Sequence, residues 1–454
     1  MYLCTNQPTG VAAVNIKGGT LHSTLGLGVN GAHRGHQVRQ EIKDRLCRIK
    51  LMIIDEISML DKKTLSDVSD RLCMARSNQK PFGGCNVALV GDFYQLAPVA
   101  GSVLYRICSR KELSSKFNAK FVQAYALWED KINCAVVLDQ VVRQQDIEFL
   151  QILTDIREGN ISKHLQVLNS RKINPPAATL IVVPDNQERI KLNHAAIAAY
   201  ANQIIADKPP IYMIMAAIKS RQNLNNNDLT QIFRMRDDQT DRLATVLFVY
   251  VGMPVTVTQN IDIKHAIANG TEARVVQVVF ADQTQFNSIG VILAGQTVNV
   301  IQPDKPPSFI VIQLLDEKSS TIQIGSLPAG LYPLKPYKQS SRVTIERTRT
   351  TTTENVTLSI GISQFPIVPM FAVTGHKVQG KTYRNGIVIG SFGKGKLDPA
   401  WAYVTISRVP SLDRLWLLEE LSETRAHRFH PPKDLINEET RLKQLSNETI
   451  QRMS

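Results

Sequence analysis

Two carboxylates, Asp55 and Glu56, directly follow the short apolar run LMII at residues 51–54. A buried strand of a parallel sheet delivers the residues after it to the carboxyl edge of the sheet, where such folds bind ligands. At that edge one carboxylate can hold a magnesium ion, and the next can orient an attacking water molecule. Because any strand can end in acidic residues, this pattern alone is only weakly specific for a nucleotide site.

A second apolar run, NVALVG at residues 86–91, continues into Asp92 and Gln95. If the two runs are neighbouring strands, Gln95 lies beside Asp55 and Glu56. An amide at this place can donate a hydrogen bond to a γ-phosphate and accept one from water. The alternative interpretation is an ordinary strand followed by a loop with a surface glutamine.

The elements that position these residues alternate between strand and helix. The apolar runs predict four buried parallel strands, and the stretches between them predict helices that include residues 62–75 and 147–157. This alternation indicates an α/β layered architecture. The predicted strands are residues 51–55, 86–91, 135–139 and 179–184.

From about residue 245 the alternation of strand-like and helix-like runs stops, and short strand-like runs follow one another. β-Branched runs separated by Gly, Asn, Asp and Pro predict a small β domain with short strands. The Thr- and Arg-rich residues 340–358 are expected in its hairpins, and NLNNND at 223–228 is expected to be a polar loop. Since strand-like and helix-like runs alternate again after Phe371, the β segment is predicted to be an insertion into a second α/β domain.

Composition narrows the class of protein. The chain has 454 residues, 43% of them hydrophobic, and a formal net charge of +13. These values fit a globular chain of roughly three domains with an anionic partner, most simply nucleic acid. We expect no membrane span and no signal peptide, and therefore an intracellular protein. None of the six cysteines forms a CxxC pair, so we expect reduced thiols and no zinc site: Cys4, Cys47, Cys73, Cys85, Cys108 and Cys134.

Seven segments, six of them numbered motifs, resemble one helicase family and occur in its order. DEISML and GDFYQLAPV resemble motifs II and III of superfamily 1 helicases, specifically the petite-integration-frequency (PIF) family of 5′-to-3′ DNA helicases and their RecD-like and Helitron-type relatives. The match is specific because the motifs occur in family order over nearly the whole chain. The other segments are residues 8–27 (motif Ia), 138–160 (motif IV), 251–276 (entry to an SH3-like domain), 373–382 (motif V) and 401–409 (motif VI).

The resemblance implies roles for individual residues. Asp55 would hold Mg²⁺, Glu56 would activate water, and Gln95 would couple the γ-phosphate of ATP to DNA movement. Arg143 and Arg408 would stabilise the phosphate charge from the second domain. An ordinary surface ion pair is the alternative for Arg143, and a core position is the alternative for His22.

The resemblance also implies further binding residues and partners. Gln379 and Gly380 would contact the nucleotide, together with the two arginines. Single-stranded and duplex DNA would be the partners, in repair, recombination or telomere maintenance, in the nucleus rather than the mitochondrion. Four residues would contact the DNA strand: Thr20, His22, His376 and Lys377.

The same resemblance implies three domains. Two RecA-like domains, residues 1–145 and 146–269 with 366–454, would flank an inserted SH3-like domain at 270–365. Residues 24–46 of the first would form the wedge that splits the duplex.

Charge is concentrated in two short segments of this scheme. Residues 17–50 hold seven basic and two acidic side chains, and residues 377–396 hold five basic and none acidic. These segments lie around motifs Ia and V, so both are expected along DNA.

A P-loop, GxxxxGK[ST], is missing ahead of Asp55. Its backbone N–H groups and lysine would cradle the phosphates. Residues 375–382, GHKVQGKT, fit the pattern letter for letter, and residues 390–397 fit it except at the last position. We reject both, because a P-loop opens a helix, whereas YRNGIVIG after Thr382 predicts a turn and a strand. The absence predicts a truncated chain that is inactive as written.

Three functions therefore remain open. The first is an ATP-dependent DNA helicase, and the second is a remnant of one that binds single-stranded DNA without hydrolysis. The third, a small-molecule phosphotransferase that uses residues 375–382, is the least favoured.

Overall fold

The computed structural model divides the chain into two compact units. Unit 1 comprises residues 1–184 and 375–454, and unit 2 comprises residues 185–374. The finer division into three domains predicted above stays a prediction. The described residues are 3–7, 19–26, 40–177, 179–265, 267–316, 322–349, 352–395 and 397–453.

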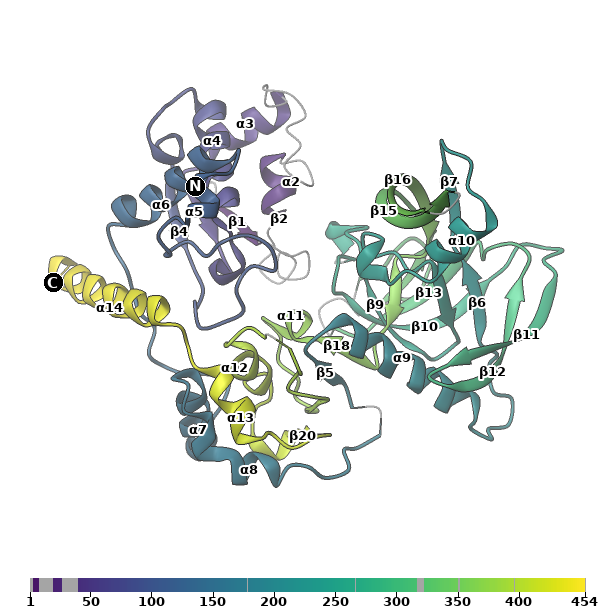
Figure 1. Cartoon of the computed structure of the whole chain (residues 1–454). Coiled ribbons are helices and arrows are strands. Elements are labelled where there is room, and N and C mark those ends of the chain that lie inside the picture. Colours follow the sequence, from purple (N-terminus) through teal and green to yellow (C-terminus); the bar gives the residue numbers. More distant parts are fainter. Residues whose placement is uncertain are drawn as a thin grey trace. The chain divides into compact units, whose positions relative to one another are not determined.

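The first sheet of unit 1 has four parallel strands in the order β2-β1-β3-β4. Buried side chains of β3 pack with α4 and with Trp128 of α6 to form its core. The strands are β1 (Leu3–Gln7), β2 (Gly19–Thr20), β3 (Leu51–Ile54) and β4 (Asn86–Leu89). The helices around them are α2 (Leu21–Leu25), α3 (Gln40–Arg48), α4 (Lys62–Arg76), α5 (Arg110–Leu113) and α6 (Asn118–Lys131) (Figure 1).

The rest of unit 1 is a second parallel arrangement. Strands β5 (Ile181–Val183), β19 (Ile387–Ile389) and β20 (Leu415–Leu417) lie side by side in parallel, with β19 in the middle. Four parallel strands were predicted from the sequence of the whole chain. Three of them are present at the predicted places, as β3 and β4 of the first sheet and β5 of the second. The helices are α7 (Ile147–Arg157), α8 (Leu165–Asn169), α11 (Gly375–Val378), α12 (Trp401–Ile406), α13 (Glu423–Ala426) and α14 (Lys433–Met453).

The predicted strand at residues 135–139 is wrong. This stretch has no strand assignment, and its two valine and one leucine side chains are exposed. The backbone N–H groups of Ala135 and Val137 donate to the hydroxyls of Thr449 and Ser446 on α14, each at 3.2 Å. A strand needs a neighbouring strand to take its hydrogen bonds, and here the side chains of a helix take them instead.

Unit 2 contains the predicted β insertion, in three sheets that hold all of its described strands but the last. One has the order β14-β13-β10-β9-β17, another β11-β12-β6-β8, and the third β15-β16-β7. Neighbouring strands in these sheets are antiparallel, except β12 and β6, which are parallel. The strands are β6 (Tyr212–Met215), β7 (Ala217–Ser220), β8 (Val246–Val249), β9 (Pro254–Val257), β10 (Glu272–Val279), β11 (Phe286–Leu293), β12 (Gln296–Pro303), β13 (Phe309–Leu314), β14 (Leu331–Leu334), β15 (Tyr337–Arg349), β16 (Thr352–Gln364), β17 (Ile367–Pro369) and β18 (Ala372–Thr374). The helices are α9 (Asn186–Ala201) and α10 (Asn226–Phe233).

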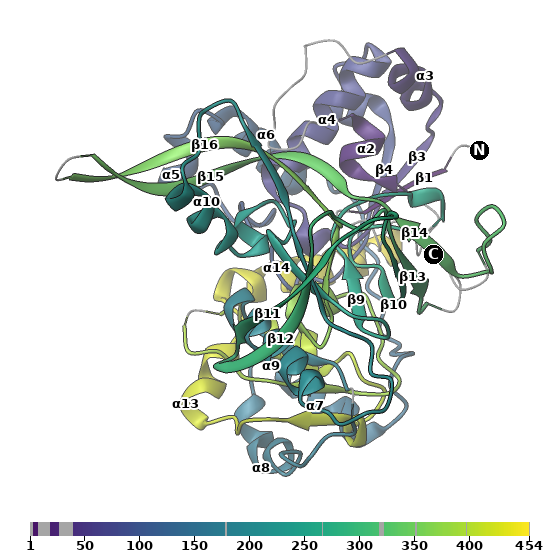
Figure 2. The same ribbon diagram turned by 90° about the vertical axis from the view of Figure 1, so that its right-hand side faces the viewer.

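The hairpin predicted at residues 340–358 is the long curved ribbon of β15 and β16 (Figure 2). The polar loop predicted at 223–228 is partly wrong, because Asn225 caps α10, which begins at the next residue. Asparagine and aspartate are favoured at such caps because their side chains bond the free N–H groups of the first turn.

Two sequence predictions are limited by the extent of the described structure. Within the proposed wedge, residues 27–39 lie outside the described residues, whereas α3 begins at Gln40. No helix in the described part of the chain is long and apolar enough to cross a membrane.

Candidate nucleotide site

The carboxyl ends of β3 and β4 are locked together. The N–H of Val90 donates to the carbonyl of Ile54 at 2.8 Å, and the N–H of Ile57 donates to the carbonyl of Val90 at 3.0 Å. Gly91 has φ +149°, and a Cβ there would lie 2.7 Å from the backbone nitrogen of Ile57. Only glycine therefore allows the two strand ends to meet, which brings the loop with Asp92 and Gln95 beside the acidic pair.

Glu56 has a strained backbone at this junction. Its φ and ψ are 55° and 48°, in the left-handed region. A side chain other than glycine costs about 1–3 kcal/mol there and persists where the surroundings enforce it, often at functional sites. Burial raises the pKa of the Glu56 carboxyl, and the charges of Asp55 and Asp92 raise it further against the opposing effects of Gln379 and Arg408. A carboxylate with a raised pKa is suited to accept a proton from water.

Gln379 holds Glu56 from the second half of unit 1. Its Nε2 donates to Glu56 Oε2 at 3.0 Å and to Ser58 Oγ at 3.2 Å. The Oε1 of Gln379 is buried and has no hydrogen-bond partner among the described residues. Gly380 follows with φ +75°, and a Cβ there would lie 3.0 Å from Glu56 Oε1. Both predicted nucleotide-binding residues of motif V therefore adjoin the predicted catalytic carboxylate.

The two predicted arginines lie together at the end of α12. Arg143 donates from Nε to Thr382 Oγ1 at 2.9 Å and from Nη1 to the carbonyl of Ser407 at 3.3 Å. Arg408 is buried, with 2% of its surface exposed, and its Nε donates to the carbonyl of Val404 at 2.6 Å. The structure thus brings both arginines near Glu56, whose charge acts on each of them.

Neither arginine has an ion-pair partner among the described residues, in contrast to the paired arginines elsewhere in the chain. Burial and the neighbouring charge of Arg143 lower the pKa of Arg408 to about 10. A buried cation without a carboxylate partner is costly, so a site that retains the buried Arg408 beside the half-buried Arg143 is suited to an anion. The phosphates of a nucleotide fit these two arginines, whereas the unpartnered Oε1 of Gln379 can accept a hydrogen bond from a donor such as water.

Asp55 is the residue that would hold Mg²⁺ with those phosphates. It lies at the end of β3, and one of its carboxylate oxygens accepts the N–H of Glu56 at 2.8 Å. A carboxylate at a strand end is a suitable ligand for Mg²⁺, which commonly uses one or two protein carboxylates together with substrate phosphates. The described residues contain no cluster of three or more metal-ligating side chains, so the protein ligands present fit only such a shared site.

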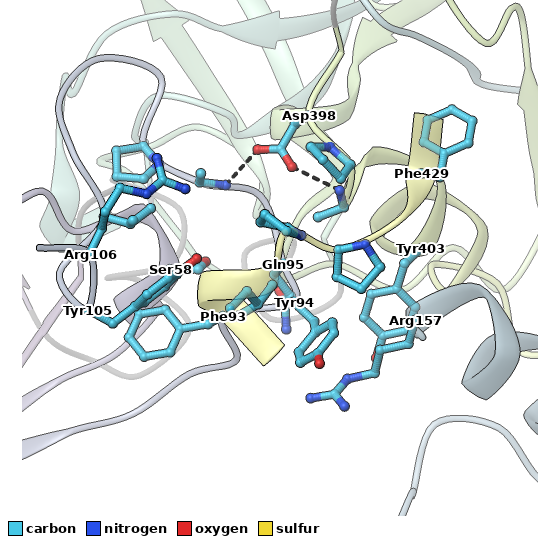
Figure 3. Close-up of a pocket in the computed structure, with 18 of the residues that line it drawn as sticks. Ser58, Phe93, Tyr94, Gln95, Tyr105, Arg106, Arg157, Asp398, Tyr403 and Phe429 are labelled. Carbon is cyan, nitrogen blue, oxygen red and sulfur yellow. Dashed lines mark hydrogen bonds between the residues drawn. The ribbon is translucent and has the colours of Figure 1, made fainter. Parts of the chain in front are cut away.

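Gln95 lines a cavity of about 220 Å³ within unit 1. Its Oε1 is buried and has no hydrogen-bond partner in the described part of the chain. Figure 3 shows Phe93, Tyr105 and Arg106 on one side of the cavity and Tyr94, Tyr403 and Arg157 on the other. Gln95 therefore lies between the two halves of unit 1, a position from which it can respond to changes in either half.

Sequence reasoning missed an ionic and aromatic cluster beside Gln95. Arg157 pairs with Asp92 at 3.1 Å and with Glu439 at 3.5 Å, and its guanidinium lies 3.9 Å from the centre of the Tyr94 ring. Tyr403 has a pKa raised by burial and lies within the electrostatic reach of both predicted catalytic arginines. The position of Asp92 after Gly91 was the available sequence signal for the cluster, but the partners on α7 and α14 had none.

The predicted DNA contacts of motif Ia lie at the start of α2. Thr20 is its N-cap, and the Thr20 hydroxyl accepts the N–H of Ser23 at 3.4 Å and donates to Ser23 Oγ at 3.0 Å. Capping of α2 is therefore a structural role for Thr20 in addition to the predicted contact with DNA. His22 lies at the surface, and partial desolvation of its ring by neighbouring atoms lowers its pKa against the opposing charge of Asp61. The histidine is therefore not in the core, and its DNA contact stays a prediction.

The predicted DNA contacts of motif V lie on α11. His376 has a pKa lowered by burial, against the opposing charge of Asp398. Asp398 in turn accepts the N–H of Ala97 at 3.0 Å (Figure 3). Lys377 is half-buried on the same short helix. Their role in binding DNA also stays a prediction.

The segment that matches a P-loop by letter has the structure expected of motif V. Gly375–Val378 is a helix, and after Thr382 the chain turns and enters β19. Thr382 accepts a hydrogen bond from Arg143. Since no helix follows Lys381, this segment does not present the helix N-terminus that a P-loop offers to phosphate.

Comparison with known proteins agrees with this geometry. Residues 3–166 match the family model of the PIF1-like helicases. ATP-dependent DNA helicase PIF1 of Emericella nidulans is 35% identical over 165 residues, which are 35% of this chain and 20% of that protein. ATP-dependent DNA helicase PIF1 of Candida albicans is 25% identical over 469 residues, 92% of this chain and 49% of that protein. The chain thus spans between about a fifth and a half of these curated relatives.

The fold also matches solved structures. The crystal structure of Pif1 helicase from Bacteroides in complex with ADP-AlF3 and ssDNA superposes with a TM-score of 0.66 at 21% identity, over 97% of this chain and 87% of that chain. The parallel sheets and the β insertion match the α/β fold of these Pif1 helicase structures. In sequence, residues 3–166 resemble the PIF1-like helicases, and nearly the whole chain resembles the Candida albicans relative at 25% identity.

Proposed function

We propose that this chain carries the ATP-hydrolysing and DNA-binding residues of a 5′-to-3′ DNA helicase. The observation that carries the proposal is the meeting of Glu56, Gln379, Arg143 and Arg408, which come from distant parts of the sequence. The likeness to a Pif1 structure in complex with ADP-AlF3 and ssDNA supports the same partners here. Repair, recombination or telomere maintenance in the nucleus is the setting we propose.

The residues divide the work of hydrolysis between them. Bound MgATP would supply the phosphoryl group that passes to water. Asp55 would hold the ion, and Glu56 would orient the water and take its proton. Arg143 and Arg408 would neutralise charge on the phosphates, an effect worth about 10³–10⁵ in rate in other phosphoryl-transfer enzymes. Gln95 lies between the two halves of unit 1. There it would couple the presence or loss of the γ-phosphate to movement of the DNA-binding segments.

The second candidate is a protein that binds single-stranded DNA without hydrolysing ATP. Its support is the charge of two short segments, residues 17–50 with seven basic and two acidic side chains and residues 377–396 with five basic and none acidic. Basic side chains of this kind can hold the phosphates of a single strand without any hydrolysis of ATP.

One pair of measurements separates the candidates. Binding of a fluorescent oligo(dT) to the purified chain is followed by anisotropy, and ATP hydrolysis is followed with and without the same oligonucleotide. Hydrolysis stimulated by DNA, with unwinding of a duplex that bears a 5′ tail but not a 3′ tail, supports the helicase. Binding without hydrolysis supports the second candidate, and absence of both at low salt contradicts both.

Replacing Lys377 by Ala tests the proposed DNA strand contact on α11. Each phosphate contact of a single strand contributes about 0.7 to the slope of log K against log salt concentration. We therefore expect the K377A chain to bind oligo(dT) more weakly than the unmodified chain. Its slope of log K against log salt concentration should be smaller by about 0.7.

The control for this experiment is Lys443→Ala. Lys443 is an exposed lysine of α14, 3.6 Å from Glu439, outside the segments proposed to bind DNA. We expect its slope to equal that of the unmodified chain. Equal slopes for all three proteins would show that Lys377 makes no contact with a DNA phosphate.

A further inference from the structure

The turn that carries Arg408 is held by a side chain from another segment. Helix α12 ends at Ile406, and the carbonyls at a helix C-terminus have no partner within the helix. Gln144 provides one from outside. Its Nε2 donates to the carbonyl of Ser407 at 2.9 Å and to the carbonyl of Val409 at 3.0 Å, and its side chain is buried, with 4% of the residue exposed.

These two hydrogen bonds bracket Arg408. The carbonyls they use belong to the residues immediately before and after it, so the amide nitrogen of Gln144 fixes the backbone on both sides of Arg408. A primary amide nitrogen carries two hydrogens and can serve both carbonyls at once. The N–H of Tyr383 donates to the carbonyl of Arg408 itself at 2.9 Å.

The guanidinium of Arg408 depends on this turn for its direction. It donates hydrogen bonds to the carbonyl of Val404 and to Ser407 Oγ, the latter at 2.7 Å, and both acceptors lie in its own helix or turn. No carboxylate among the described residues pairs with it to set its direction independently. The orientation of the guanidinium is therefore coupled to the backbone that Gln144 holds.

We propose that Gln144 is the positioning residue for Arg408, and that it aims the guanidinium at the phosphates. The proposal deepens the proposed function of the same site and rests on it for the identity of the anion. Arg143, its neighbour in sequence, bonds the same carbonyl of Ser407 at 3.3 Å. One dipeptide would thus both supply an arginine to the site and orient the other.

The test uses Gln144→Met, which keeps the length of the side chain and removes both donors. The readout is the Nε–H signal of Arg408 in a spectrum of ¹⁵N-arginine-labelled protein, identified by its loss in Arg408→Lys. In Q144M we expect this signal to shift and its hydrogen to exchange at least about tenfold faster, because a mispositioned turn exposes the group. Gln144→Asn keeps the amide and is expected to restore part of the protection.

Inorganic tripolyphosphate serves as the probe of the anion site. We expect it to shift the Arg408 signal in the unmodified chain, and to bind Q144M about tenfold more weakly, since small displacements of a positioned group are costly. If tripolyphosphate leaves the signal of the unmodified chain unchanged, the proposed function fails while the comparison of exchange rates still decides the role of Gln144.

The matched control is Gln364→Met in unit 2. Gln364 is equally buried, at 2% exposed, and its Nε2 donates to the carbonyl of Ile214 at 3.0 Å. This variant loses a buried amide of the same kind away from the site. It should lower stability without moving the Arg408 signal. An unchanged Arg408 signal in Q144M, or an equal change in Q364M, would overturn the proposal.

Discussion

Glu56→Gln is expected to lower DNA-stimulated ATP hydrolysis by about 10²–10⁴-fold, the usual contribution of a general base. A glutamine has nearly the same shape and can still accept the hydrogen bond that Gln379 donates to Glu56 Oε2. It cannot take a proton from water. The variant therefore removes the proposed chemistry and keeps the contact between the two halves of unit 1. The measurement is the steady-state rate with saturating oligo(dT) and MgATP.

The raised pKa of Glu56 adds a pH dependence with a defined sign. The base form is needed for hydrolysis, so the rate of the unmodified protein should rise with pH through the pKa of Glu56, above the range of an ordinary carboxyl. A raised pKa in the folded state means that ionisation opposes folding. The free energy of unfolding due to Glu56 is thus greatest below the ordinary pKa and falls as pH rises through the raised one.

E56Q should remove this dependence without any need for hydrolysis. We expect E56Q to be more stable than the unmodified chain at neutral pH and equal to it in acid below the ordinary glutamate range, as measured by urea unfolding. Asp238→Asn is a useful control, because Asp238 pairs with Arg236 in unit 2 and not in the site. Hydrolysis within a factor of two of the unmodified rate would exclude Glu56 as the base.

The strands and the site could be predicted from the sequence to different degrees. LMII before Asp55 and NVAL before Gly91 are short apolar runs, and both are strands in the structure. Their adjacency follows from parallel pairing at the carboxyl edge. The residues of motifs V and VI reach Glu56 only through the fold, and resemblance rather than spacing predicted that meeting.

What could not be predicted depends on partners far away in the chain. Residues 135–139 have the composition of a strand, but hydroxyls of α14, more than 300 residues later, take their backbone hydrogen bonds. The role of Gln144 is equally invisible in sequence, because its two acceptors are backbone carbonyls and any residues could supply them. Local patterns predict which elements form, whereas these contacts depend on which distant elements meet.

Arg408→Met is expected to change stability and hydrolysis in opposite directions. The guanidinium of Arg408 is 2% exposed, lies near the charge of Arg143 and has no ion pair among the described residues. Replacement of a buried ion pair by apolar side chains of similar volume is often neutral or stabilising by about 1–4 kcal/mol, and a buried charge without a partner should cost the folded protein at least as much. The folded protein without nucleotide should therefore unfold at higher urea concentration when this charge is absent.

The same change should lower ATP hydrolysis by about 10³–10⁵-fold, the range for an arginine that stabilises phosphoryl transfer. Arg408→Lys is expected to recover little of it, because an ammonium cannot keep the bonds to Val404 and Ser407 while presenting a planar group to the phosphates.

Arg347→Met is the matched control for both measurements. Arg347 of β15 bonds Asp228 through two nitrogens, at 3.1 and 2.9 Å, so its charge is paired. Loss of one partner of such a pair leaves a buried carboxylate, since Asp228 is 1% exposed, and should destabilise the protein. A loss of stability in R408M like that in R347M would mean that the Arg408 cation is satisfied within the protein. In that case the buried charge of Arg408 would carry no free-energy cost in the folded protein. The inference that the site retains this charge in order to bind phosphate would then fail.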